Sequence, residues 1–79
     1  MTFDYSRLKG KIKEYFDTQK CFAEALEISS ASLSYKLNNL SYFTQSEILK
    51  SIEFLKIPIE EIEKYFFTVN TRYKNQGGG

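Results

Sequence analysis

Apolar residues recur at every third or fourth position along most of this 79-residue sequence. That spacing matches the period of an α-helix, because side chains three and four positions apart lie on one helix face. A strand-like alternation of apolar and polar residues is confined to a short segment after Phe67. The sequence therefore predicts an all-α protein, and its length favours one domain.

Five short helices account for the pattern, at about residues 5–16, 18–26, 30–38, 45–55 and 59–67. Before the fourth helix, Thr44 and Glu47 have the spacing of a capping box, in which each side chain bonds the other residue's backbone amide. Pro58 separates the last two helices, because a residue that precedes proline avoids helical backbone.

The predicted core is formed by the inward-facing positions of these helices. On the second and third helices they are Phe22, Ala23, Leu26, Leu33 and Leu37. On the fourth and fifth helices they are Ile48, Leu49, Ile52, Leu55, Ile59, Ile62 and Phe66. We expect residues 1–67 to form the folded domain and residues 68–79 to form an extended or disordered C-terminal tail.

Residue types that many enzymes and metal sites need are scarce. The sequence has no histidine and one cysteine, Cys21, which we expect to be a half-buried thiol. A Ser-His-Asp triad, a Cys/His zinc site and an intrachain disulfide are therefore excluded. We expect no enzyme activity, no metal and no cofactor. No apolar run approaches the roughly 18 residues of a membrane span, and no signal-peptide pattern is present, so the expected location is the cytoplasm.

The segment TQKCFAEALEISSASLSYKLNN has the outline of two helices joined by a tight turn. Ala23 is small enough for the two helices to cross closely, and Ile28 fills the turn. If Leu33 and Leu37 face the core, the second helix presents small hydroxyl side chains outward. Such a face suits the DNA major groove, because short side chains let the backbone approach the bases and hydroxyls both donate and accept hydrogen bonds.

Residues 3–67 resemble the small phage regulators of the Cro and lysogeny-repressor type, within the helix-turn-helix repressor superfamily. The resemblance rests on the segment quoted above and on a later one, TQSEILKSIEFLKIPIEEIEKYFF. It implies a compact five-helix helix-turn-helix domain. It also implies a sequence-specific transcriptional regulator of a phage-type genetic switch, acting on operator DNA in a bacterial cell.

We expect specific DNA contacts from the outward face of helix 30–38 and from the resemblance. Four side chains are expected to read bases, with Tyr35 as the strongest contact: Ser30, Ala31, Ser34 and Tyr35. Six residues are expected to contact phosphates: Gln19, Lys20, Ser29, Lys36, Asn38 and Asn39. In the alternative, the serines have no role in binding: they only cap the helix and keep its outer face hydrated.

Three features favour a different function for the same fold. One is that the hydroxyls of Ser30 and Ser34 discriminate bases poorly. The net charge is only +1, from 11 basic and 10 acidic residues, whereas phosphate binding relies on positive charge. Glu27 and Lys56 stand where the family usually has glycine. A left-handed backbone at Glu27 would cost about 1 kcal/mol, and its carboxylate would lie near the DNA. The alternative hypothesis is a modulator or antirepressor that binds a partner repressor protein.

Chain association is expected in the C-terminal region. A DNA-binding module this small usually dimerises on a palindromic site, so we expect a homodimer on DNA. Phe67, Val69 and Tyr73 are the predicted interface, because apolar side chains on a segment with few neighbours often mark one. In the alternative, Phe67 folds onto the core and the remaining residues are a frayed tail.

Overall fold

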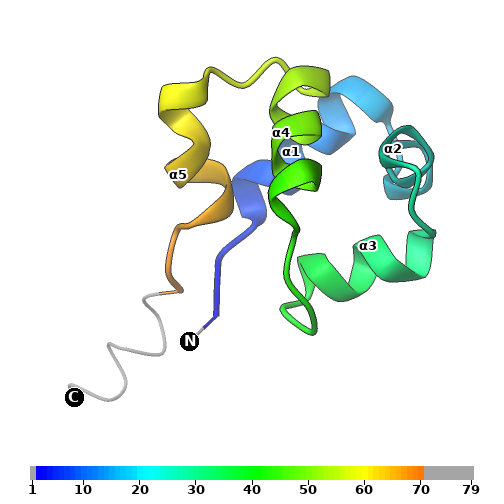
Figure 1. Cartoon of the computed structure of the whole chain (residues 1–79), viewed down its shortest axis with the longest axis horizontal. Coiled ribbons are helices and arrows are strands. Elements are labelled where there is room, and N and C mark those ends of the chain that lie inside the picture. The colour runs from blue at the N-terminus through cyan, green and yellow to red at the C-terminus, as the bar shows by residue number, and fades with distance from the viewer. Residues whose placement is uncertain (1, 71–79) are drawn as a thin grey trace.

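The computed structural model describes residues 2–70, which contain five α-helices (Figure 1). The elements are α1 (Ser6–Phe16), α2 (Gln19–Leu26), α3 (Ser30–Leu37), α4 (Gln45–Phe54), the 3₁₀ turn η1 (Ile59–Glu61) and α5 (Ile62–Phe66). Within the described range, extended pairing is limited to one antiparallel bridge between Phe3 and Val69. The predicted all-α, five-helix fold is confirmed.

Side-chain caps determine where α2 and α3 begin. The Thr18 hydroxyl accepts a hydrogen bond from the Cys21 amide (3.1 Å), and the Ser29 hydroxyl accepts one from the Ser32 amide (3.0 Å). Each bond satisfies an amide that has no partner within the helix, which typically contributes about 1 kcal/mol. Because these caps are visible in the sequence, the predicted starts of both helices lie within one residue of the observed ones.

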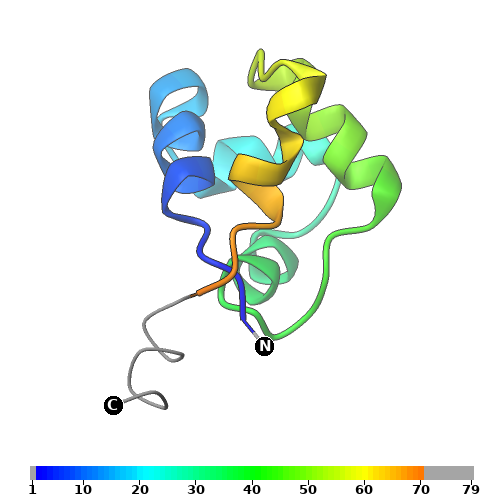
Figure 2. The ribbon, with the colours of Figure 1, turned by 90° about the vertical axis from the view of Figure 1, so that its left-hand side faces the viewer.

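A single apolar core lies where the helices meet. It includes every residue that the sequence places inward on α2 and α3: Phe22, Ala23, Leu26, Leu33 and Leu37. The α1 helix packs against α2 and α5, and α2 also contacts α3 and α4. Figure 2 shows α3 at the lower edge of the molecule, beside the chain ends, with α1 and α4 above it. One long side of α3 is therefore left uncovered by other helices.

The inward face of α4 agrees with the prediction at Leu55, which is buried, and at Ile48 and Ile52, which pack against the core, but it differs at Leu49 and Ser51. Leu49 is exposed, so its assignment to the core is wrong. The fully buried residues here are Ser51 and Leu55. Burial of Ser51 is tolerated because its hydroxyl donates a hydrogen bond to the Glu47 carbonyl (2.7 Å). The buried face of α4 thus includes a polar residue that the apolar pattern of the sequence does not indicate.

The segment before α5 also differs from the prediction. Ile59 is exposed, so its assignment to the core is wrong, and Ile57 is buried instead. The physical reason is the short η1 turn after Pro58, which delays the α-helix until Ile62. Phe66 is buried as predicted.

Two residues have the left-handed backbone that is expected at positions where the family usually has glycine. Glu27 has φ 61° and Lys56 has φ 55°. At the end of α2, the amide of Ile28 donates to the Ala23 carbonyl (3.0 Å), and such bonds satisfy carbonyls left open by the helix. The Glu27 carboxylate lies 4.0 Å from the ammonium of Lys50 on α4. The turn between α2 and α3 is therefore closed without glycine.

The two ends of the described chain run side by side near α3 (Figures 1 and 2). Next to the Phe3–Val69 bridge, the Asp4 amide donates to the Thr68 carbonyl (2.8 Å). The side-chain amide of Asn39 accepts from the Phe3 amide (2.9 Å) and donates to the Phe3 carbonyl (3.0 Å). Residues 71–79 of the predicted tail lie outside the described residues.

Candidate functional site

The outward face of α3 is defined by the burial of its opposite face. Leu33 and Leu37 are buried against the core. On the outer side, Ser30 and Ala31 are exposed, and Tyr35 has 56% of its surface exposed. Ser34 is half-buried. The four predicted base-reading residues therefore lie on one helix, three of them fully open to a partner, and their role in reading DNA stays a prediction.

Three of the predicted phosphate contacts are available at the surface. Gln19 and Lys20 are exposed at the start of α2. Asn38 is exposed at the end of α3, where its side-chain amide donates to the Ser34 carbonyl (2.8 Å). The Ser29 hydroxyl already accepts a bond as the cap of α3. Phosphate binding by these residues stays a prediction.

Asn39 has a structural task that competes with a phosphate contact. It is half-buried, and both ends of its side-chain amide bond the backbone of Phe3. The residue has a left-handed backbone, with φ 64°, a conformation that asparagine tolerates better than most residues do. A phosphate contact through this amide would require it to release Phe3.

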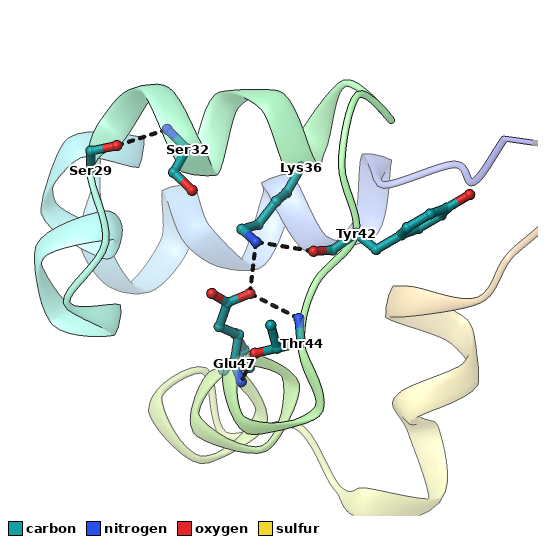
Figure 3. Close-up of polar contacts among 7 residues, drawn as sticks. Ser29, Ser32, Lys36, Tyr42, Thr44 and Glu47 are labelled. Carbon is teal, nitrogen blue, oxygen red and sulfur yellow. Dashed lines mark hydrogen bonds and ion pairs between the residues drawn. The ribbon is translucent and has the colours of Figure 1, made fainter.

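Lys36 points inward, contrary to what a phosphate contact needs. Only 8% of the residue is exposed. Its ammonium donates to the Tyr42 carbonyl (3.0 Å) and lies 3.1 Å from the Glu47 carboxylate (Figure 3). The same carboxylate accepts from the Thr44 amide (2.9 Å), and the Thr44 hydroxyl accepts from the Glu47 amide (3.1 Å), which completes the predicted capping box. A phosphate contact would require this network to open.

Glu47 is held in its ionised form by the same network. Burial raises the pKa of its carboxyl, but the Thr44 amide and the Lys36 ammonium outweigh burial and lower the pKa below the ordinary value of 4.5. Lys36 thus joins three parts of the chain: α3, the following loop and the start of α4. The sequence signal for this role is weak, because nothing local indicates that Glu47 lies opposite Lys36.

Charge is nearly absent from α3 and from the loop that follows it. Lys36 is the one charged residue between Glu27 and Glu47, in a sequence that is 27% charged. Since Lys36 is buried and paired, α3 and the loop that follows it present no exposed charge. This depletion is visible in the sequence, and it leaves α3 with no exposed cation to offer a phosphate.

Two apolar residues in the loop after α3 extend the outward face. Leu40 is 73% exposed and Tyr42 is 76% exposed. The Leu40 amide donates to the Tyr35 carbonyl (2.8 Å), which turns the loop back over the end of α3. Figure 3 shows the Tyr42 ring extending away from the Lys36 network. Tyr35, Leu40 and Tyr42 are hereafter called the neutral patch.

A pocket of about 270 Å³ adjoins the neutral patch, and Tyr42 forms part of its wall. Six aromatic side chains line it, together with Gln45 and Ile48: Phe3, Tyr5, Tyr42, Phe43, Phe66 and Phe67. Several of these rings meet edge to face, for example Phe43 and Phe66, whose centroids are 5.3 Å apart. This aromatic pocket has no charged residue in its lining, so its chemistry suits an apolar side chain.

The predicted interface residues lie near the same pocket. Phe67 and Val69 are both exposed. The Phe67 ring packs edge to face on Phe3, with centroids 6.0 Å apart, and Val69 pairs with Phe3. Tyr73 lies outside the described residues. Chain association through these positions stays a prediction.

Comparison with known proteins finds a matching family and a similar solved structure. Residues 1–69 match DUF739, described as "Protein of unknown function". The chain belongs to the DUF739 family. Among solved structures, this DUF739 chain is similar to the solution structure of the modulator of repression (MOR) of the temperate bacteriophage TP901-1 from Lactococcus lactis. The two share 42% sequence identity with a TM-score of 0.74, over 89% of this chain and 97% of that chain.

These findings bear on the resemblance drawn from the sequence. The similarity to MOR supports the phage-regulator part of it. DNA binding of the Cro type is tested by neither finding and stays a prediction. A search of curated proteins finds no match. Within residues 2–70 of this DUF739 chain, no helix has the length and apolar composition that a membrane crossing requires.

Proposed function

We propose that this DUF739 chain is a phage modulator of repression, which acts by binding a repressor protein. The observation that carries the proposal is the 42% identity to MOR over nearly the full length of both chains. The function requires a stable folded surface and no catalysis or cofactor. Its expected place of action is the cytoplasm of the bacterial host, where a phage repressor would be found.

The electrostatics of the helix-turn-helix also support a protein partner. Proteins that bind DNA obtain most of their non-specific affinity by neutralising phosphates with lysine and arginine. Here the one lysine on α3 is buried and paired with Glu47. Interfaces between proteins, in contrast, are depleted of charge at their centre and enriched in tyrosine. The lack of exposed charge on α3 and the exposure of Tyr35 are the two properties of this face that suit a protein partner.

A DNA-binding regulator is the second candidate, because one geometric feature favours it. The start of α3 is open to solvent, with Ser30 and Ala31 exposed, and this is the part of a recognition helix that enters the major groove. The exposed Gln19 and Lys20 at the start of α2 could contact phosphates beside it. Such a regulator would bind as a homodimer on a palindromic operator.

Electrophoretic mobility shift measurements distinguish the two functions. The probes are the upstream DNA of this phage region and the purified repressor encoded in the same phage genome. We expect the chain alone to leave the DNA unshifted, and to change the amount of repressor bound to it. Specific binding by the chain alone, with affinity that falls steeply as salt rises, would instead support the DNA-binding regulator.

Tyr35→Ala provides a sharper test of the DNA-binding candidate. If α3 reads bases, the substitution should weaken specific DNA binding by about 1–3 kcal/mol. Stability should not change, because Tyr35 is 56% exposed and loses little buried contact area. Fluorescence anisotropy with the upstream DNA measures the first quantity, and thermal unfolding measures the second. An unchanged affinity for DNA would show that Tyr35 does not read bases.

A further inference from the structure

We propose that the neutral patch and the aromatic pocket together form the surface that binds the repressor, and that they receive an uncharged segment carrying a protruding apolar side chain. This inference rests on the proposed function, and it goes further by naming the surface and the chemistry of its occupant. The proposed contact lies at the end of α3 and in the loop that follows. A DNA-binding regulator would instead contact its operator through the start of α3.

The absence of charge determines the chemistry of the occupant. Neither the neutral patch nor the pocket lining includes a charged residue. A carboxylate or ammonium on the partner would lose water here without gaining an opposite charge, which costs several kcal/mol. The same argument disfavours nucleic acid, whose phosphates would meet no exposed cation on α3 or the loop after it. The surface therefore complements a partner segment that is itself neutral.

The shape of the surface fits a partner with a protruding side chain. Leu40 and Tyr42 project into solvent, while the aromatic pocket beside Tyr42 is a hollow of about 270 Å³. Binding energy in protein interfaces is concentrated where a large side chain fills a desolvated pocket. Phe67, which is exposed and lines the pocket, would lose further surface to water when the pocket is filled.

Buried Lys36 makes this surface rigid before any partner arrives. Its ammonium bonds the backbone carbonyl of Tyr42, and it is next to Tyr35 in sequence (Figure 3). The Leu40 amide is bonded to the Tyr35 carbonyl. All three residues of the neutral patch therefore stand on backbone that is fixed by hydrogen bonds. A preorganised surface binds more tightly because less conformational freedom is lost on association.

Binding measurements with the purified, full-length repressor of the same phage genome test the assignment. Leu40→Ala and Tyr42→Ala should each weaken binding by about thirtyfold. Tyr42→Glu should weaken it further, because it introduces an unpaired carboxylate beside the pocket. Tyr15→Ala and Ile59→Ala are matched controls: both residues expose apolar surface, on α1 and η1, and neither belongs to the neutral patch or lines the aromatic pocket. Both variants should leave binding within about threefold. Circular dichroism should show all five variants folded.

The outcomes separate this inference from the function on which it rests. A wild-type chain that does not bind the repressor overturns the proposed function. Binding that survives the Leu40 and Tyr42 substitutions, or is lost only in the Tyr15 and Ile59 variants, overturns the surface alone. Affinity that falls steeply between about 0.1 M and 1 M salt overturns the neutral occupant. Loss of affinity for operator DNA in the same variants would assign the surface to nucleic acid and overturn the proposal.

Discussion

Replacing Leu33 with alanine is expected to lower the free energy of unfolding by about 2–5 kcal/mol. Leu33 is completely buried, on the face of α3 that meets the core. The substitution removes apolar contacts and leaves a cavity that the surrounding helices fill only in part. A protein of this size typically has a total stability of only about 5–15 kcal/mol, so the variant should be partly unfolded at physiological temperature.

Urea unfolding followed by circular dichroism measures this loss, and Tyr35→Ala is the matched control. Both residues lie on α3, but Tyr35 is 56% exposed, so its truncation should change the unfolding midpoint very little. If Leu33→Ala keeps the stability of the wild type, α3 must be rotated relative to the core, and the outward face described above would be a different set of residues.

Breaking the pair between Lys36 and Glu47 is the second large effect. Lys36→Met leaves a carboxylate with little solvent and no cation beside it, which costs about 3–5 kcal/mol for a fully buried pair. We expect the lower end of that range, because the two side chains keep 10% and 15% of their surface exposed. The Tyr42 carbonyl also loses its donor. Lys36→Met combined with Glu47→Gln should recover part of the loss, since no buried charge remains.

The pH dependence of stability tests the same pair. The folded state lowers the pKa of Glu47, so the ionised carboxyl stabilises the fold. This contribution is fully present above the unfolded pKa, which is near 4.5, and is lost as the pH falls through the lower folded value. Chemical unfolding at a series of acidic pH values should show that Glu47→Gln loses less stability on acidification than the wild type. Equal losses in the two proteins would mean that folding does not lower the pKa of Glu47.

The sequence predicts the helix-turn-helix well because its signals there are local. Thr18 and Ser29 cap the helices that they precede, and Leu33 and Leu37 repeat at the helical period on the buried side. Each of these residues is informative without knowledge of the rest of the chain. The left-handed turn at Glu27 is also anticipated, since it occupies the position where related proteins have glycine.

The sequence fails where a residue's role depends on distant neighbours. A lysine on an otherwise neutral helix is usually solvated. Glu47 comes to Lys36 only because α3 and α4 both contact α2 in the folded chain. Leu49 fits the apolar period of α4 as well as Ile48 and Ile52 do, but only the latter two pack against the core, and Ser51 is buried beside them. The aromatic pocket combines residues from both chain ends with the start of α4, and no local pattern could join them.

The pairing of Phe3 with Val69 closes a loop that spans nearly the whole chain, and this has a consequence for how the molecule folds. Closing so long a loop costs conformational entropy, which slows folding until other contacts offset it. A short pairing at the chain ends is also among the first parts to open in the native state. Phe3 is a wall of the aromatic pocket. Opening of this pairing would therefore remove a wall of the pocket, so the surface that we assign to the partner is complete only while residues 3 and 69 stay paired.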